Sequence, residues 1–590
     1  MGFRQSFSRS YNRGVSSLVR FYRYVLRHPA GAAVVFLASL VSAATALPVP
    51  LLVRAVIDDA LPSRDTGLLV ALVAGICVAW LVSHGLMIAG SYGAAWVREN
   101  VHLAVRQDLF EHLQAQPVRY FEDRETGGLV SRLTNDVAAV QGLIGERLFE
   151  AAGELVYLVG GAVILVRLDW RLALVSLVTL PLVSAIFALL RRRLHTAQLR
   201  LQESQEDLSA RLFESLAGIR VVQAFGLESR EARRTREHGT ALKRVQLRKQ
   251  LVTSVAAGLG IVLTLVPVAV VVWGFGGSRV LSGALSLGTL IAFYHYLGTF
   301  FRPMGVIFRL VAELLGAIAA ADRVFEVLDQ PPAVTDPAGG GVRPEQVEGR
   351  IELADVSFEH VEGQRALDEV TLSIEPGEVV GLVGPSGAGK TTLAHLLVRF
   401  ADPTSGAVRL DGHDLRDLSL ARLREVVGLV SQDVFLFNDT VRENLRVGSL
   451  GASDDEVARA AEAIGAAEFI ERLSDGYDTV IGERGARLSG GQRQLLALGR
   501  ILLRDPRVLV FDEATSALDP ATEARLQDAL ETAMSGRTTI IIAHRWSTLR
   551  LARRIVVLDH GRVAGQGAHE DLLSEVAVYR ELTAAQQVGV

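Results

Sequence analysis

A glycine-rich stretch carries the residues whose spacing most directly indicates chemistry. In "GPSGAGKTT", Gly384, Gly389, Lys390 and Thr391 fit the pattern G-x-x-x-x-G-K-[ST], with a strand-like run before it and a helix-like run after it. Glycines let backbone N–H groups wrap phosphates, lysine reaches the β- and γ-phosphates, and the threonine hydroxyl suits Mg²⁺. The flanking strand and helix disfavour the alternative of a chance glycine-rich turn. The stretch predicts these nucleotide contacts: Gly384, Pro385, Ser386, Gly387, Ala388, Gly389, Lys390, Thr391 and Thr392.

A second stretch, "VLVFDEA", adds two carboxylates. Its apolar residues place Asp512 at the carboxyl end of a buried strand, which is where ligands bind in parallel sheets. We expect Asp512 to hold Mg²⁺ and Glu513 to activate a water molecule. An apolar run followed by Asp-Glu is common by itself. Together with the glycine-rich loop it predicts hydrolysis of a phosphoanhydride.

A third stretch, "ARLSGGQRQLLALGRILL", has the pattern of a capped helix. Ser489 is followed three residues later by Gln492, which is the capping-box spacing, and an apolar helical face comes next. Two glycines in the first turn weaken such a helix by roughly 1 kcal/mol each relative to alanine. Gly490 and Gly491 are therefore either a tolerated defect or the mark of a ligand that approaches the backbone closely.

The elements that position these residues belong to the second half of the chain. Short apolar runs such as "VVGLVG" (379–384) and "TTIIIAH" (538–544) are typical of buried strands in a parallel sheet, and helical stretches separate them. Residues 351–590 are thus predicted to form an α/β domain. The preceding segment, 329–350, is rich in proline and glycine and is predicted to be a linker.

The first half of the chain is predicted to be a membrane domain. A helix needs about 20 apolar residues to cross the hydrocarbon core. Residues 29–328 contain six runs of that size, of which the one at 148–166 includes two glutamates. The runs at 66–97 and 250–278 exceed one crossing, so their helices should tilt or project into water. The six predicted spans are 29–53, 66–97, 148–166, 172–190, 250–278 and 280–301.

Arginine placement gives the orientation. Residues 1–28 contain six arginines and no acid, and the connections 98–145 and 191–249 are also basic. Both termini are therefore expected in the cytoplasm, with 1–28 as a cytoplasmic N-terminal segment. The expected location is the inner (cytoplasmic) membrane of a bacterium, because the chain has one membrane domain and shows no organelle-type presequence; an organellar membrane is the alternative. A cleaved signal peptide is the alternative, but the first apolar run is too long for one. The two long connections should be helical, with tips near 122–128 and 225–231.

Composition narrows the remaining classes. The 590 residues are 49% hydrophobic, carry a net charge of −4 and include one cysteine, so disulfide frameworks and cysteine-ligated zinc are excluded. Nothing in the bulk charge favours nucleic acid as a partner. The predicted surroundings are a lipid bilayer.

Taken in order, the glycine-rich loop, "LSGGQ" and "FDEATSALD" resemble the nucleotide-binding domain of an ABC transporter. "FEDRETGGLVSRLTNDV" (121–137) and "GIRVVQAFGLE" (218–228) resemble the membrane domain of its exporters, of the MsbA-like, type IV, multidrug and lipid kind. The resemblance covers nearly the whole chain and makes it a half-transporter. It implies a helical six-span membrane domain with long cytoplasmic extensions, followed by an α/β P-loop ATPase domain.

The resemblance also assigns roles to single residues. It implies that Glu513 is the general base, that His544 contacts the γ-phosphate, and that Gln432 is catalytic and contacts ATP. Thr391, Gln432 and Asp512 would hold Mg²⁺, and Asp519 would form the D-loop. The signature would bind the ATP of a partner subunit; its residues are Leu488, Ser489, Gly490, Gly491 and Gln492.

One position departs from the family pattern. An aromatic residue usually follows the "VSF" strand and stacks on adenine, whereas this chain has His360. A histidine ring can still stack, with less face area. The alternative is that His360 is an ordinary exposed strand residue.

The implied mechanism requires two nucleotide-binding domains that close head-to-tail on two ATP molecules and switch the membrane domain by alternating access. Every catalytic motif is intact, which favours a homodimer over a heterodimer with a second half-transporter. The implied function is ATP-driven export or flipping of an amphiphilic drug or lipid. A soluble ABC ATPase is disfavoured by the six spans, and an ATP-gated channel is the harder alternative.

Ionisable residues inside predicted spans are candidate substrate contacts. Glu150 and Glu154 lie one turn apart on one face of the third span, and His295 lies in the sixth. If Glu154 lines the cavity, a cationic amphiphile is favoured. The alternative places both glutamates on a water-exposed extension or in a pair with arginine.

Overall fold

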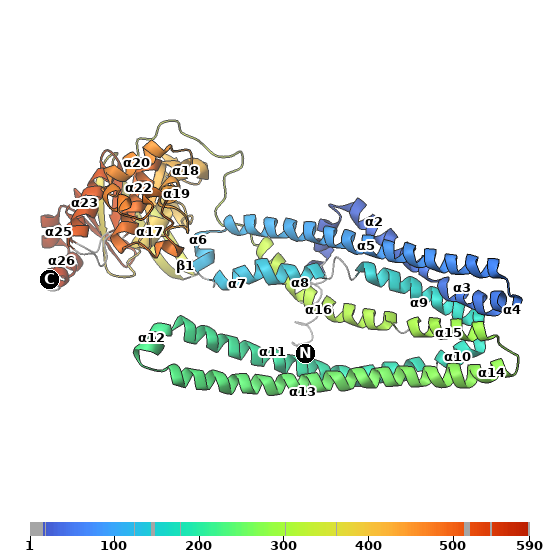
Figure 1. The fold of residues 1–590 in the computed structure, drawn as a ribbon. Helices are drawn as coiled ribbons and strands as arrows, with labels where there is room; N and C mark the ends of the chain where they lie inside the picture. Colours follow the sequence, from blue (N-terminus) through green and yellow to red (C-terminus); the bar gives the residue numbers. More distant parts are fainter. Residues whose placement is uncertain are drawn as a thin grey trace. The chain divides into compact units, whose positions relative to one another are not determined.

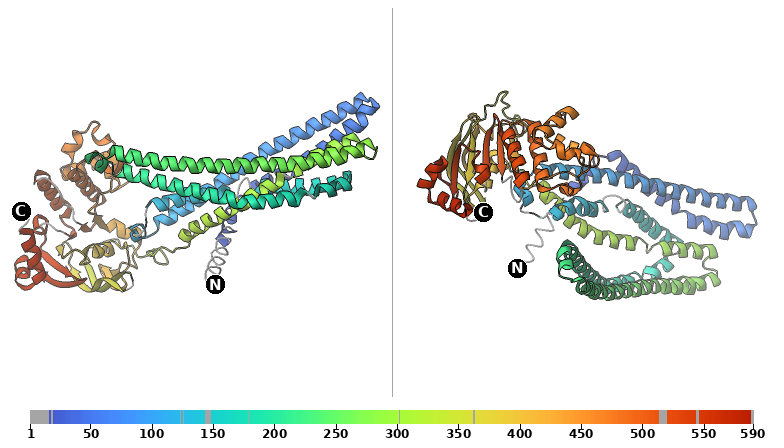
Figure 2. Two further views of the ribbon diagram at one scale, coloured as in Figure 1. Left: turned by 90° about the horizontal axis from the view of Figure 1, so that it is seen from below. Right: turned by 60° about the vertical axis from the view of Figure 1, so that its left-hand side comes forward.

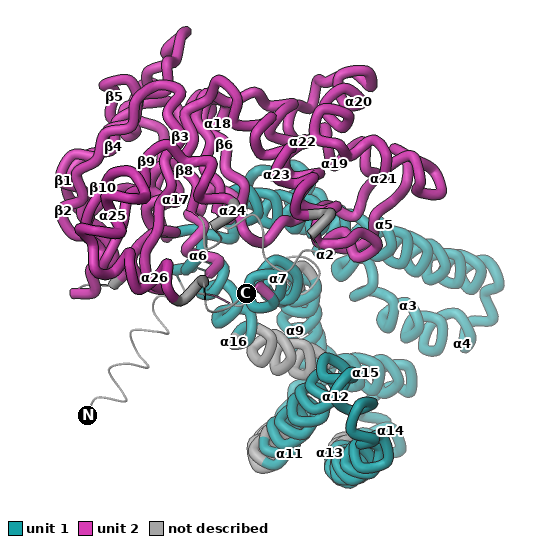
Figure 3. The backbone as a smooth tube through the Cα atoms, turned by 90° about the vertical axis from the view of Figure 1, so that its left-hand side faces the viewer, with its two compact units in different colours: residues 1–111, 127–329 teal, residues 112–126, 330–590 magenta. Residues whose placement is uncertain are grey.

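The computed structural model describes residues 16–17, 19–122, 124, 126–142, 148–177, 179–300, 302–361, 363–512, 520–542 and 546–587. The chain divides into two compact units, shown in different colours in Figure 3. Residues 1–111 and 127–329 form the first unit. Residues 112–126 and 330–590 form the second, so the chain enters the second unit twice.

The described part of the first unit is helical. Its elements, labelled in Figure 1, are α2 (Pro29–Ala46), α3 (Val49–Ala55), η1 (Val56–Ala60), α4 (Leu61–Ser63), α5 (Thr66–Gln114), α7 (Thr126–Ser131), η2 (Arg132–Asp136), α8 (Val137–Gly142), α9 (Leu148–Leu168), α10 (Trp170–Leu177), α11 (Thr179–Ala217), α12 (Ile219–Ala224), α13 (Glu228–Val268), η4 (Ala269–Gly276), α14 (Gly277–Leu281), α15 (Leu287–Phe300) and α16 (Arg302–Leu328).

Several of these helices match the thickness of a bilayer. Among the described residues, Pro29–Ser63, Thr66–Gln114 and Glu150–Leu168 are long and apolar enough to cross it, and Ala269–Leu281 is a shorter apolar stretch. Helix α5 has 49 residues, about 70 Å at 1.5 Å per residue, which is more than one crossing needs. The predicted span at 172–190 includes residue 178, which lies outside the described residues.

Two of the three longest helices in the described part of the unit form a hairpin. Helices α11 and α13 lie side by side in Figures 1 and 2, with the short helix α12 at their turn. The chain reverses at Phe225–Leu227, where Gly226 has a φ of +61°. This is the tip that the sequence predicted near 225–231, and the helical connection that leads to it was also predicted.

The boundary between the last two predicted spans was wrong. The predicted boundary was Arg279, the one charge between two apolar runs, but α14 continues to Leu281 and α15 begins at Leu287. Arg279 stays within the helix because its guanidinium lies 3.1 Å from the carboxylate of Asp169. The reversal occurs instead around Gly283, which has a φ of +73°.

A proline bend separates α2 from α3. Pro48 and Pro50 lack N–H groups, and the N–H of Leu51 donates to the Pro48 carbonyl rather than to Leu47. The carbonyl of Leu47 instead accepts a hydrogen bond from the hydroxyl of Tyr296 on α15, a side chain that is almost fully buried. The bend is thus tied to α15.

The second unit is an α/β domain with two sheets. The larger sheet has the order β10-β9-β3-β8-β7-β6 and is parallel except for the β10–β9 pair; the smaller is antiparallel, in the order β2-β1-β4-β5. Several strands of the unit are visible in Figure 2. The strands of the two sheets are β1 (Ile351–Val361), β2 (Gln364–Ile374), β3 (Val379–Val383), β4 (Ser405–Leu410), β5 (His413–Asp414), β6 (Val427–Val430), β7 (Val508–Asp512), β8 (Thr538–Ile542), β9 (Arg554–Asp559) and β10 (Arg562–Gly567).

Helices cover the larger sheet and complete the unit. The strands β3, β7 and β8 coincide with the apolar runs that predicted a parallel sheet, and their buried side chains form two hydrophobic clusters with the surrounding helices. The helices are α6 (Val118–Glu122), α17 (Lys390–Leu397), α18 (Leu420–Val426), α19 (Val441–Arg446), α20 (Asp454–Ala463), α21 (Ala467–Glu471), η5 (Gly476–Asp478), η6 (Glu483–Gly485), α22 (Gly490–Arg504), α23 (Pro520–Met534), α24 (Trp546–Leu549), α25 (His569–Glu575) and α26 (Ala577–Gln587).

The segment between α16 and β1 is irregular. Residues 329–350, all of them described, form no helix or extended strand, and an isolated bridge pairs Val342 with Leu418. The Gln330 carbonyl at its start accepts hydrogen bonds from Gln116 and His112, at 2.9 Å each.

Candidate functional site: a phosphate loop at the edge of a parallel sheet

The glycine-rich loop connects strand β3 to helix α17. Gly389 is the N-cap of α17, with a φ of +99°, and no side chain caps the first-turn N–H groups. A Cβ atom at position 389 would overlap the carbonyl oxygen of Ala366 on β2. Only glycine fits both the backbone conformation and the close approach of β2. The helix N-terminus is thereby left open toward the loop, as an anion site requires.

Lys390 lies inside this loop. Its side chain is buried, and its Nζ donates hydrogen bonds to the carbonyls of Gly384 and Pro385, at 2.8 and 2.9 Å. These bonds hold the ammonium group against the loop backbone, next to the open N-terminus of α17. A positive charge and backbone N–H donors therefore converge on one point.

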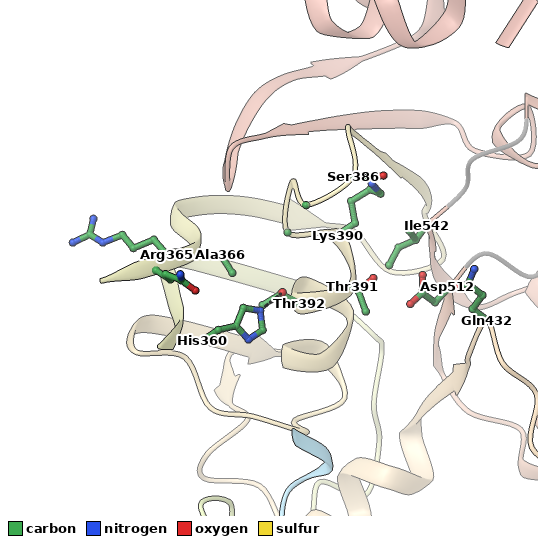
Figure 4. A pocket seen from close by; sticks show the side chains of 13 residues that line it. His360, Arg365, Ala366, Ser386, Lys390, Thr391, Thr392, Gln432, Asp512 and Ile542 are labelled. Atoms are coloured by element: carbon green, nitrogen blue, oxygen red, sulfur yellow. Dashed lines mark hydrogen bonds between the residues drawn. The ribbon is translucent and has the colours of Figure 1, made fainter. Parts of the chain in front are cut away.

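A cavity of about 430 Å³ opens beside the loop. Its size lies within the usual range for small-molecule sites. Figure 4 shows His360 and Arg365 toward one end and Thr391, Asp512 and Gln432 toward the other. Its lining residues are His360, Gln364, Arg365, Ala366, Ser386, Gly387, Gly389, Lys390, Thr391, Thr392, Gln432, Asp512 and Ile542.

Three oxygen-bearing side chains gather at one end of the cavity. Strands β6 and β7 pair in parallel, so their carboxyl ends meet at one sheet edge, where Asp512 is the last residue of β7 and Gln432 lies two residues beyond β6. Thr391 faces them from the first turn of α17. A hydroxyl, an amide oxygen and a carboxylate suit Mg²⁺, which typically takes few protein ligands and completes its shell with water and phosphate oxygens.

His360 lies at the other end. It is exposed on β1, its ring packs edge-on against Phe358 with 5.2 Å between the centroids, and its Nε2 lies 3.2 Å from the hydroxyl oxygen of Thr392. The ring lines the same cavity as Lys390.

Four lining residues were not predicted: Gln364, Arg365, Ala366 and Ile542. The first three lie at the start of β2, which reaches the loop only because β1 and β2 form a hairpin. Asp368 places Arg365 by accepting its Nη1–H at 2.6 Å, and it also accepts the Nε–H of Arg562 at 2.8 Å. Hydrogen bonds from Arg562 and then Arg365 hold the pKa of the Asp368 carboxyl below its usual value. A run of alternating polar residues gave no signal of these roles.

The signature stretch forms a capped helix, as predicted. The Gln492 N–H donates to the Ser489 hydroxyl at 3.2 Å, and the Gln492 side chain accepts from the Ser489 N–H at 2.8 Å. Ser489 and Gly490 are exposed at the start of α22, whereas Leu488 and Gly491 are buried. None of the described residues that line the phosphate cavity belongs to this stretch. The signature stretch and the phosphate cavity are therefore separate parts of the described surface.

Arg500 fixes helix α22 to the segment that follows Gln432. Its guanidinium donates to the carbonyls of Asn444 and Phe435 and to the side-chain oxygen of Asn444, each at 2.7 Å. Burial lowers the pKa of Arg500 to about 10, so the group remains charged at neutral pH. The end of β6 and the signature helix are thus mechanically linked.

Three predicted residues fall outside the described residues: Glu513, His544 and Asp519. In the sequence, Glu513 directly follows β7, Asp519 directly precedes α23, and His544 comes two residues after β8. The parallel register of β7 and β8 pairs Asp512 with Ile542, so the two strands end at the same edge of the sheet.

The candidate substrate residues lie in the first unit. Glu150 and Glu154 on α9 both line a second cavity, and Glu154 is buried. His295 is exposed on α15, where its ring lies near Tyr294, and it does not line that cavity.

A helical unit with bilayer-length apolar helices, joined to an α/β unit with a phosphate loop, defines a membrane transport protein that hydrolyses ATP. The chain belongs to the ABC transporter family. Residues 32–304 match the family model for the ABC transporter transmembrane region, and residues 367–516 match the ABC transporter model. The first half is accordingly a transmembrane domain and the second a nucleotide-binding ATPase domain whose ATP hydrolysis is coupled to transport.

Relatives cover almost the whole chain. The chain is 36% identical to the uncharacterized ABC transporter ATP-binding protein YknV of Bacillus subtilis, over 93% of this chain and 91% of the relative. It is 34% identical to an ATP-dependent lipid A-core flippase of Syntrophus aciditrophicus, over 97% and 94%. A solved structure of a bacterial Atm1-family ABC exporter with ATP bound is similar, with a TM-score of 0.77, 28% identity, and coverage of 95% of this chain and 98% of that one. The chain is therefore an ABC exporter.

Proposed function

We propose that the protein exports an amphiphilic substrate, or flips it between leaflets, by alternating access powered by Mg²⁺-dependent ATP hydrolysis. The similarity to lipid A-core flippases and to an Atm1-family exporter supports export. Neither relative fixes the substrate. A bacterial inner membrane with both termini in the cytoplasm fits the basic residues of 1–28 and 191–249.

At the nucleotide site, Lys390 and the loop N–H groups would bind the phosphates, and His360 would stack on the base. Thr391, Gln432 and Asp512 would hold Mg²⁺, which neutralises charge on the transferring phosphoryl group. Glu513 would accept a proton from the attacking water, and His544 would contact the γ-phosphate. The chemistry consists mostly of positioning and electrostatic stabilisation.

The observation that carries the proposal is the separation of the signature from the phosphate cavity. Ser489 and Gly490 form an exposed helix N-terminus, a surface that suits phosphate, yet they do not line the cavity that contains Lys390. A second nucleotide-binding domain, packed head-to-tail, would bring the signature of each chain to the phosphate of the other. Two copies of this chain would complete two sites.

The hairpin of the helical unit also favours a partner chain. Beyond the charged parts of α11 and α13, its end exposes large apolar side chains, in positions where they would meet water: Phe213, Leu216, Val221 and Phe225. Several exposed large apolar side chains at one end of a hairpin are typical of an interaction site. We infer that it docks on a second copy, where closure of the ATP-bound domains would move it and switch the membrane helices.

The test is Glu513→Gln in the full-length protein, reconstituted in bilayers. The variant should bind ATP as well as the unchanged protein, lose almost all hydrolysis and accumulate a closed dimer, because proton transfer to the side chain is removed while the phosphate contacts remain. Steady hydrolysis by this variant would rule out Glu513 as the general base.

Transport itself is tested by vesicle flux. With ATP outside inside-out vesicles, a pump accumulates an amphiphile against its gradient, and Glu513→Gln abolishes that accumulation. Downhill flux alone would instead identify an ATP-gated channel.

A further inference from the structure

Helix α22 carries the signature at its N-terminus and a half-buried arginine, Arg500, in its second half. Arg500 lies about 15 Å from Gly490 along the helix axis, at 1.5 Å per residue. Among the described residues, none that lines the phosphate cavity belongs to α22. The contacts of Arg500 therefore show to which part of the domain the signature helix is attached.

The guanidinium of Arg500 attaches α22 to the chain segment between Gln432 and α19. Its Nη1 donates to the carbonyl of Phe435, its Nε to the carbonyl of Asn444, and its Nη2 to the side-chain oxygen of Asn444, each at 2.7 Å. A planar fork with donors in fixed directions fits three separate acceptors, whereas the point charge of a lysine does not. The attachment therefore depends on an arginine at this position.

Asn444 holds the other side of this contact. Its side chain is fully buried, its oxygen accepts the Phe437 N–H at 2.9 Å, and its amide nitrogen donates to the carbonyls of Phe437 and Thr440, at 3.0 and 2.9 Å. Together with the bond from Arg500, these contacts use every hydrogen-bonding group of the amide. The segment after Gln432 is thus fastened to α19 by Asn444, and Arg500 adds the connection to α22.

Close backbone packing restricts α22 at the same level. A Cβ atom at Gly448, two residues after α19, would lie 2.1 Å from the carbonyl oxygen of Arg500. A Cβ atom at Gly499 would lie 2.6 Å from a methyl group of Leu445. Two glycines therefore let the end of α19 touch α22 beside Arg500. Hydrogen bonds and packing together define the position of the signature helix relative to the segment after Gln432.

The two ends of this connection serve different nucleotides in the proposed mechanism. Gln432 lines the phosphate cavity of its own chain, whereas Ser489 and Gly490 are exposed and would meet the ATP of a partner. Backbone N–H groups bind a phosphate only within a narrow range of distance and angle. A small displacement of α22 would therefore remove the contact with the partner's ATP.

We propose that Arg500 is a positioning residue that holds α22 on the segment after Gln432, so that the signature reaches the ATP bound by a second copy of the chain. This role rests on the proposed head-to-tail function, which it deepens. Arg500 does not line the cavity of its own chain and contacts no nucleotide bound there. It therefore acts on hydrolysis at the partner's cavity, a direction that a general loss of stability does not have.

The test uses mixed dimers with a single working site, purified through a different affinity tag on each full-length chain. Lys390→Ala removes the phosphate contact of one chain, and Gly490→Asp places an anion at the signature of the other. Hydrolysis then depends on the cavity of the Gly490→Asp chain and on the signature of the Lys390→Ala chain. Arg500→Lys is added to one chain or to the other, and kcat is measured in nanodiscs at saturating ATP.

The two placements of Arg500→Lys should differ. In the Lys390→Ala chain, whose signature is used, the substitution should lower kcat about tenfold or more, the scale of a displaced catalytic contact. In the Gly490→Asp chain, whose signature is already blocked, the same substitution should cost far less. A merely structural role would lower kcat equally in both placements.

Arg504→Lys is the matched control, because Arg504 lies on the same helix but its Nε donates to the carbonyl of Arg424 on α18. It should leave kcat unchanged in either chain. If Arg500→Lys yields no folded dimer, Arg500→Gln replaces it, since glutamine places no charge in this half-buried position. It should show the same difference between the two placements.

An equal loss of kcat in both placements, no loss in either, or a larger loss in the Gly490→Asp chain would overturn the role of Arg500. The proposed function is judged by the mixed dimer that keeps Arg500 in both chains. If that dimer hydrolyses no more ATP than the separate variants, the shared sites fail and the role of Arg500 fails with them. If it hydrolyses ATP but the two placements do not differ, the role of Arg500 alone is refuted.

Discussion

At the scale of single residues, the nucleotide site depends on where backbone groups are left open. Gly389 leaves the first turn of α17 uncapped and admits β2, whereas Ser489 caps α22 through a reciprocal pair of hydrogen bonds. The same element, a helix N-terminus, is thus prepared in two ways. At α17, the side chain of Lys390 lies beside the open N-terminus. At α22, the small side chain of Ser489 remains exposed beside Gly490.

Two capping boxes in the described part of the second unit allow the role of Ser489 to be separated from its effect on stability. Ser453 caps α20 in the same way, through Glu456, in a position that does not line the phosphate cavity. Ser489→Ala and Ser453→Ala should each lower the free energy of unfolding by about 1 kcal/mol. Only Ser489→Ala should also lower ATPase activity beyond the loss of folded protein. Thermal unfolding and ATP hydrolysis of both variants, measured side by side, check this; equal activity of the two variants would contradict a signature role for Ser489.

At the scale of elements, the two sheets of the nucleotide-binding domain are joined beside the cavity. Asp368 on β2 binds Arg562 on β10, and the Asp368 N–H donates to the carbonyl of Gly561 at 2.9 Å. The hairpin that carries His360 and Arg365 is therefore fastened to the sheet that carries the phosphate loop. The position of this hairpin relative to the phosphate loop determines how long the cavity is.

This junction has a defined pH dependence. Because the folded-state pKa of Asp368 lies below its ordinary value of 3.8, its stabilisation is present above that pH and is lost as the pH falls through the lowered folded-state pKa. Asp368→Asn should therefore lower the unfolding temperature by a constant amount from about pH 5 to 8, and the difference should close toward pH 3. Unfolding curves of both proteins across this range check it. A difference that instead grew in acid would contradict the assignment.

The elements also show what the sequence could predict. Uninterrupted apolar runs predicted β3, β7 and β8, and the capping spacing predicted the start of α22, because each depends on neighbouring residues alone. The turn at Gly283 was not predicted, because Arg279 indicates a boundary between two spans unless its ion pair with Asp169 is known. The π-helical segments η1 and η4 were not predicted either. The lining of both cavities by Arg365, Ser39 and Tyr157 depends on long-range packing, for which local sequence carries no signal.

At the scale of the whole molecule, the proposed mechanism requires two copies of the chain, because the signature lies outside the phosphate cavity. The phosphate cavity and the exposed signature are separate surfaces of the same unit, and intact residues are present in both. A symmetric dimer uses each surface twice.

Mixing two inactive variants tests this arrangement. Lys390→Ala removes the phosphate contact, and Gly490→Asp places an anion where the partner's γ-phosphate would lie, at an exposed helix start that tolerates an acid. Each variant alone should be inactive. When the two are expressed together, half of the dimers are mixed and carry one intact site, so about a quarter of the activity should return by symmetry. Hydrolysis rates of the two variants and of the co-expressed mixture check this. No recovery at any mixing ratio would contradict shared sites.

The second unit is formed by two separate segments of the chain, which limits the rearrangements of the gene that can yield a stable protein. Residues 112–126 belong to the nucleotide-binding unit by packing, and the buried Gln116 donates to the carbonyl of Gln330. If the gene were divided at residue 330, the first product would contain residues 112–126 and the second residues 330–590, and these two segments would still pack against each other. Recombination that exchanges only the downstream part would join Gln116 to a foreign neighbour. Chimeras that keep their stability should be those that carry residues 112–126 along with 330–590.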